Sequence, residues 1–136
     1  GQEAALSMYQ NGADVVYHAS GATGVGVFQA AQEEGRFAFG VDLDQSITEA
    51  EFSDVIVASM VKRVDTAVYE SIANVIDGDH QGGEAVALGL ESNGVECVYG
   101  GEIGDAVPDG ITTAVADTRD SIIAGDIDVP TEPDGN

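Results

Sequence analysis

The sequence predicts an α/β fold in which a parallel sheet is flanked by helices. Short segments rich in β-branched residues alternate with helix-like stretches along the 136 residues, and such alternation is typical of parallel sheets. Each of four predicted helices also runs into a glycine, which supplies the left-handed backbone that closes a helix. These glycines are Gly12, Gly35, Gly78 and Gly125.

The predicted elements follow one another closely along the chain. Five segments have the length and composition of strands: residues 14–18, 37–41, 55–59, 86–90 and 95–99. A helix is predicted over residues 64–76, where apolar residues recur at helical spacing at Val64, Val68, Ile72 and Ile76. The last helix opens at Pro108 and repeats the pattern at Ile111, Val115 and Ile122. Residues 131–136 form an acidic tail that we expect to be loose.

The chain is strongly acidic, with 25 Asp and Glu against four Lys and Arg and a formal charge of −21. Nucleic acid is not expected as a partner, because neutralising phosphates requires clustered Lys and Arg, and an anionic membrane surface is disfavoured for the same reason. Self-repulsion destabilises so charged a compact state unless salt screens it. The composition therefore favours a protein adapted to high salt.

The sequence offers no catalytic constellation, no cofactor motif and no metal-ligand spacing. Cys97 is the only cysteine, which excludes an internal disulfide, and its strand-like setting predicts a small buried hydrophobe. His18 and His80 lack partners at metal-ligand spacing. No apolar run approaches the roughly 18 residues of a membrane span.

Three candidate binding residues lie where a predicted strand passes into a helix, the place where parallel α/β sheets bind ligands. The first is Gly21, within residues 20–26 (SGATGVG). Glycine lets a ligand approach the backbone, and N–H groups at a helix start can donate to it. The glycine spacing matches neither the dinucleotide fingerprint nor a P-loop, so a tight turn without a ligand is the alternative.

The other two candidates are Asp42 and Lys62, each at the end of a predicted strand. The Asp42 carboxylate can accept hydrogen bonds from two neighbouring sugar hydroxyls; the alternative is a helix cap or a loop carboxylate. Lys62 is the only lysine and stands beside Arg63. It could place its charge beside Asp42 or donate to a ligand oxygen, and the alternative is a surface salt bridge.

Four segments form a specific set when they are taken together. They are residues 12–24 (GADVVYHASGATG), 40–45 (GVDLDQ), 59–65 (SMVKRVD) and 125–130 (GDIDVP). In this order they resemble the C-terminal part of the basic membrane protein (BMP/Med) family, the purine-nucleoside-receptor-like substrate-binding lipoproteins of ABC transporters. The resemblance covers nearly the whole chain.

The resemblance implies the type I periplasmic-binding-protein fold, in which two α/β lobes joined by crossing strands enclose a nucleoside. The family's ribose-binding carboxylate and lysine fall on Asp42 and Lys62, and a pocket glycine falls on Gly21, with Ala22 in place of the next glycine of the family's turn. The implied partners are a nucleoside, with purine nucleosides expected, and an ABC permease. The implied location is extracytoplasmic, on the cell surface through a lipid anchor that this chain lacks.

The resemblance also implies a division of the chain. Residues 1–130 would form the C-terminal portion of the fold, with residues 1–42 and 84–125 in the second lobe and residues 54–78 in the first. A binding protein without enzymatic activity is the leading hypothesis. The alternatives are a nucleoside- or sugar-sensing receptor or regulator with the same fold, and an α/β enzyme holding a nucleotide cofactor on the glycine turn.

Overall fold

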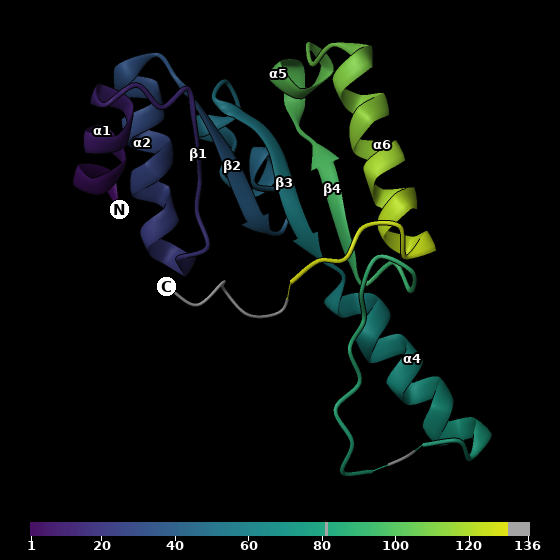
Figure 1. Ribbon diagram of the computed structural model, residues 1–136. Coiled ribbons are helices and arrows are strands. Elements are labelled where there is room, and N and C mark those ends of the chain that lie inside the picture. The colour runs from purple at the N-terminus through teal and green to yellow at the C-terminus, as the bar shows by residue number, and fades with distance from the viewer. Residues whose placement is uncertain (81, 131–136) are drawn as a thin grey trace.

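The computed structural model describes residues 1–80 and 82–130, which form one four-stranded sheet with helices around it (Figure 1). The strands are β1 (Val15–Tyr17), β2 (Phe37–Asp42), β3 (Ile56–Lys62) and β4 (Val95–Tyr99), paired in that order. β1, β2 and β3 run parallel, and β4 runs antiparallel to β3. The predicted α/β class with a parallel sheet is thus confirmed, with one antiparallel strand at the edge.

The four helices predicted from the sequence end close to their glycines, and the structure adds two short helices. They are α1 (Gln2–Gln10), α2 (Val25–Glu34), α3 (Gln45–Thr48), α4 (Val64–Asp77), α5 (Gly101–Asp105) and α6 (Asp109–Ala124), with short 3₁₀ turns at η1 (Gly21–Gly24) and η2 (Ala50–Phe52). Gly35, Gly78 and Gly125 adopt the left-handed conformation directly after α2, α4 and α6. Within the described residues, no helix is both long and apolar enough to cross a membrane.

The hydrophobic core lies between the sheet and the α1–α2 pair (Figure 1). Phe28 and Ile56 are fully buried there, from α2 and β3 respectively. Tyr9 of α1 is buried as well, and its hydroxyl donates to the carbonyl oxygen of Phe37 at 2.7 Å. This core fixes β1, β2 and β3 side by side, so their carboxyl ends share one edge.

The opposite face of the sheet is covered unevenly. α6 lies beside β4 (Figure 1), whereas large apolar side chains on β1 and β2 remain exposed. These side chains are Val15, Tyr17, Phe37 and Phe39.

α4 projects away from the sheet (Figure 1), and none of its residues, all of which the structure describes, is buried. The predicted apolar face of Val64, Val68, Ile72 and Ile76 is therefore present but exposed.

Two sequence-based predictions, the strand at residues 86–90 and the burial of Cys97, are wrong. Residues 86–90 form no strand, and Val86 is 79% exposed, because this segment returns from the far end of α4 and reaches no neighbouring strand to pair with. β4 runs antiparallel for a related reason: the chain returns beside β3 instead of crossing over the sheet. Cys97 is exposed rather than buried, since it faces the loosely covered side under α6.

The expected division of the chain into two lobes stays a prediction. Residues 54–78 are expected in the first lobe, and β3 within this segment pairs in parallel with β2 from Ala38 opposite Ile56 to Asp42 opposite Val61. The chain leaves this sheet only after Lys62, where α4 begins. The acidic tail predicted at residues 131–136 lies outside the described residues.

Candidate functional site

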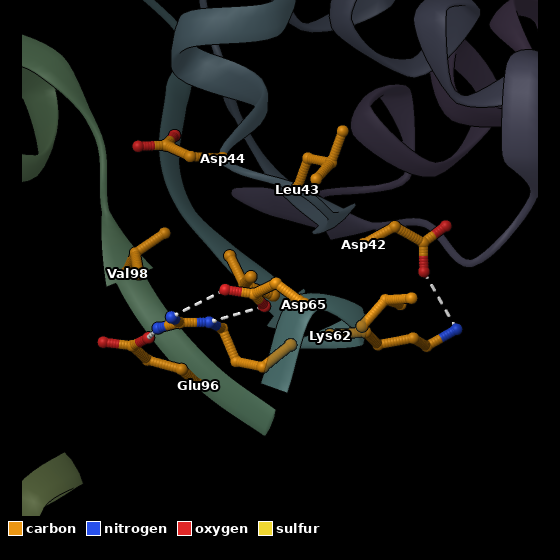
Figure 2. A pocket seen from close by; sticks show the side chains of 10 residues that line it. Asp42, Leu43, Asp44, Lys62, Asp65, Glu96 and Val98 are labelled. Carbon is orange, nitrogen blue, oxygen red and sulfur yellow. Dashed lines mark hydrogen bonds and ion pairs between the residues drawn. The ribbon is translucent and has the colours of Figure 1, made fainter. Parts of the chain in front are cut away.

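The sheet brings two of the three candidate residues into direct contact. Asp42 ends β2 and Lys62 ends the adjacent parallel strand β3. Lys62 Nζ lies 2.9 Å from Asp42 Oδ1, as the dashed line in Figure 2 shows. The hydrogen bond to Asp42 and the charge of that carboxylate raise the pKa of Lys62, so the ammonium stays charged across the physiological range.

Asp42 adopts an unusual backbone conformation. Its φ is +70°, one of two positive values among the described residues other than glycine. Residues with a Cβ adopt this left-handed region at a cost, and such strain gathers at functional sites. The conformation turns the chain sharply at the end of β2 and leaves the carboxylate at the edge of the sheet beside Lys62 (Figure 2).

Asp42 and Lys62 line an open hollow of about 570 Å³ (Figure 2). That volume falls within the range of small-molecule sites, about 300–1,000 Å³. The hollow is bounded by the ends of β2 and β3, the start of α4 and the facing part of β4. Its lining residues are Asp42, Leu43, Asp44, Val61, Lys62, Arg63, Val64, Asp65, Glu96 and Val98.

Arg63 links the end of β3 to the start of α4 and to β4 through hydrogen bonds. Its guanidinium donates to both carboxylate oxygens of Asp65, at 3.2 and 3.1 Å, and to Glu96 at 3.0 Å. Its backbone N–H donates to the carbonyl oxygen of Gly94 at 2.9 Å. Hydrogen bonding to Arg63 lowers the pKa of Asp65, with a further contribution from the backbone N–H of Thr66. Arg63 thereby fixes the start of α4 against β4, directly beside Lys62.

The two carboxylates near the end of β2 have different roles. Asp44 Oδ1 accepts from the backbone N–H of Ser46 at 3.1 Å and from its hydroxyl at 2.6 Å, so Asp44 is the N-cap of α3. Asp42 makes no cap and pairs with Lys62. The cap alternative considered for Asp42 therefore belongs to its neighbour.

The glycine turn after β1 separates into one open glycine and two packed ones. Gly21 has a φ of +55° and open space where a side chain would stand. A Cβ at Gly24 would overlap the imidazole of His18, and a Cβ at Gly26 would lie 2.5 Å from the backbone nitrogen of Gln2. Gly24 and Gly26 thus serve packing, which removes two of the three glycines on which a phosphate-binding loop would depend.

Gly21 lies on the same edge of the sheet as Asp42 and Lys62, because it follows parallel strand β1. It does not line the hollow around Asp42. The structure therefore joins two of the predicted residues directly and places the third on the neighbouring strand end.

Sequence reasoning missed several residues of this site. Glu96 and Val98 reach the hollow because β4 pairs with β3, a neighbour relationship that residue spacing does not reveal. Tyr17, at the end of β1, is exposed and close enough to contribute to the raised pKa of Lys62. An aromatic residue at a predicted strand end was the available signal for Tyr17.

Comparisons with known proteins indicate one family. The family model described as Bmp, ABC transporter substrate-binding protein PnrA-like, matches residues 1–132. A CD4+ T-cell-stimulating antigen of Listeria monocytogenes is 34% identical over 98% of this chain and 40% of its own length. The ABC transporter nucleoside-binding protein BmpA of Lactococcus lactis is 31% identical over 97% of this chain and 40% of its own length.

A solved structure shares the fold. An ABC transporter solute-binding protein from Aeropyrum pernix K1 matches with a TM-score of 0.75 and 26% identity, over 98% of this chain and 44% of that one. The predicted resemblance and the predicted fold are both confirmed. The chain spans 40% of the length of each of the two curated relatives named above.

Proposed function

Because this chain belongs to the Bmp family of PnrA-like ABC transporter substrate-binding proteins, we propose that it carries part of a nucleoside-binding site for an ABC importer. The observation that carries the proposal is the pair of Asp42 and Lys62, whose charged groups lie 2.9 Å apart at adjacent strand ends. A carboxylate and an ammonium at this spacing can accept from and donate to neighbouring hydroxyls of one ribose. Purine nucleosides are the expected ligands.

The Asp42 and Lys62 side chains are accessible to a ligand. The Asp42 and Lys62 side chains are 54% and 62% exposed, so a ligand can reach both without displacing other side chains. The neighbouring hollow is open, and a site with one wall does not enclose a ligand. The proposal therefore places a second wall opposite the strand ends, as in a two-lobed binding protein, with Gly21 at its margin.

In this role the protein binds its ligand and releases it unchanged. Asp42 and Lys62 neutralise one another, and neither is arranged as a nucleophile with its base. The protein would deliver nucleosides to a permease at the outer face of a membrane, held there by a lipid anchor on the full-length protein.

Isothermal titration calorimetry in molar potassium chloride tests the proposal, with adenosine, guanosine, inosine, uridine and ribose as probes. The protein is the full gene product that contains residues 1–136. D42A and K62A should each weaken binding of the preferred nucleoside by about ten- to a hundredfold, because a charged hydrogen bond is lost. The matched controls are D14A and R36A, which remove a 2.7 Å ion pair elsewhere on the surface and should leave affinity unchanged. Equal affinity in D42A, K62A and the controls would refute the site, and turnover of a nucleoside would refute the assignment as a binding protein.

A further inference from the structure

His18 is a buried imidazole placed behind the candidate site. It follows β1 and is only 5% exposed. Its ring lies edge-on to the ring of Phe28, with centroids 5.1 Å apart. Within the described residues neither ring nitrogen has a hydrogen-bond partner, so packing rather than hydrogen bonding holds the side chain.

His18 supports the turn that contains Gly21. Gly24, at the end of this 3₁₀ turn, is buried and lies so close that a Cβ there would overlap the imidazole. The backbone of Gly24 has an ordinary φ of −61°, which any residue adopts. Glycine is therefore required at this position by contact with His18 and not by backbone conformation.

His18 also lies near the end of β2, because Tyr17 is paired with Phe39 and His18 is the next residue. Gln45 and the charge of Asp42 raise the pKa of His18, against the larger effect of burial, which lowers it. Gln45 in turn connects two strands, because its side-chain Oε1 accepts from the backbone N–H of Val41 at 2.8 Å and its backbone N–H donates to Ser59 Oγ at 3.1 Å. One buried ring thus contacts the turn that contains Gly21 and lies near the end of β2, the strand that carries Asp42.

We propose that His18 is a positioning residue that sets the Gly21 turn relative to Asp42 through its contact with Gly24. The inference rests on the proposed nucleoside site, because it explains how two strand ends keep the spacing that one ligand requires. His18 does not touch the ligand in this role, since its ring nitrogens are inaccessible.

Four variants of the full gene product test the inference: H18A, G24A, H18A/G24A and the wild type. G24A forces a methyl into the imidazole and should weaken nucleoside binding about tenfold. H18A should also weaken it, because the turn loses its support. H18A/G24A should recover affinity to within about threefold of the wild type, because the new methyl occupies part of the vacated space. Calorimetry is done at a temperature where every variant is folded.

Matched controls separate positioning from general damage. G110A adds a methyl at a helical glycine with open space around it, and H80A removes the other histidine, which is exposed. Both should bind like the wild type. Single variants that unfold at lower temperature but bind with unchanged affinity would overturn the inference, as would a double variant no better than G24A.

Amide hydrogen exchange at Gly21 and Thr23 distinguishes this inference from the proposed function. If the wild-type protein binds none of the nucleosides, the proposed function is refuted, but hydrogen exchange in the turn can still be measured. Faster exchange in both single variants and recovery in H18A/G24A would support the positioning role. Unchanged exchange in the single variants would refute it.

Discussion

Lys62 Nζ and Asp42 Oδ1 lie 2.9 Å apart although both side chains are more than half exposed. An ion pair in contact with water contributes little to stability. The backbone of Asp42 is meanwhile held at a φ of +70°, which costs stability. Stability therefore does not explain the arrangement, and we infer that it is maintained for binding.

Substitutions of Asp42 should separate stability from binding. D42G relieves the left-handed strain and should keep or raise the free energy of unfolding, by up to about 1 kcal/mol. D42N should be close to the wild type, since Asn tolerates this conformation, and D42A should be destabilised by about 1 kcal/mol. Denaturant unfolding measures the order. All three should bind nucleoside weakly, and a tight-binding D42G would contradict the role of the carboxylate.

Removal of Arg63 should raise the pKa of Asp65. Hydrogen bonds from Arg63 are the largest cause of the low pKa, and the Thr66 N–H remains after the change. R63Q should therefore restore the pKa only partly, as read from carboxyl ¹³C shifts during titration. Asp65 contributes stability above its unfolded-state pKa, and this contribution is lost as pH falls through the folded value. R36Q is the control, because Arg36 pairs with Asp14 instead; an Asp65 titration unmoved by R63Q would contradict the contact.

Acidification should destabilise the chain through His18. Burial lowers the pKa of His18, with Gln45 and Asp42 opposing the effect only in part. The unfolded chain, with a His pKa of about 6.5, then takes up the proton first as pH falls. The contribution of neutral His18 is complete above that value and declines below it, toward the lower folded pKa.

The measurement compares unfolding midpoints at about pH 7.5 and about pH 5.5. H18Q should show a smaller drop than the wild type, and H80Q should match the wild type. An equal drop in H18Q would locate the acid sensitivity elsewhere.

Two isoleucines should differ sharply on truncation. Ile56 of β3 is fully buried, and I56A should cost about 2–5 kcal/mol of unfolding free energy. Ile72 of α4 is 56% exposed, and I72A should change it by less than about 0.5 kcal/mol. If the apolar face of α4 mediates self-association of residues 1–136, V68S/I72S should also reduce the association seen by analytical ultracentrifugation. A large destabilisation by I72A would show that α4 packs against the chain.

Folding should depend on salt. The formal charge of −21 is offset by only four basic residues, and molar salt shortens the Debye length to about 3 Å. The thermal midpoint should rise from low to molar potassium chloride. A midpoint that is flat or falls with salt would count against adaptation to high salt.

Local signals in the sequence predicted most of the fold. Gly35, Gly78 and Gly125 marked helix ends because the left-handed conformation is a property of a few neighbouring residues. The strand predicted at residues 86–90 failed because a strand needs a partner. Its β-branched composition says nothing about whether the chain brings it to a sheet edge.

In the candidate site, too, local sequence signals predicted some residues and missed those that depend on how the chain folds. Asp42 and Lys62 were predicted because each follows a strand, and parallel pairing then brought the strand ends together. Glu96 was missed because its place depends on β4 reversing direction beside β3. Gly24 lies in the same glycine-rich turn as the candidate Gly21, and only the position of His18 shows its packing role.

The departure of α4 from the sheet has a mechanical consequence. At a rise of about 1.5 Å per residue, its 14 residues make a rigid lever about 21 Å long. Arg63, between Lys62 and the first residue of α4, holds the near end of this helix against β4. A rotation of about 10° there would carry the free end of a lever of this length through roughly 4 Å. A shift of the end of β3 that tilted α4 would therefore produce a much larger displacement at the far end of the helix than at Lys62.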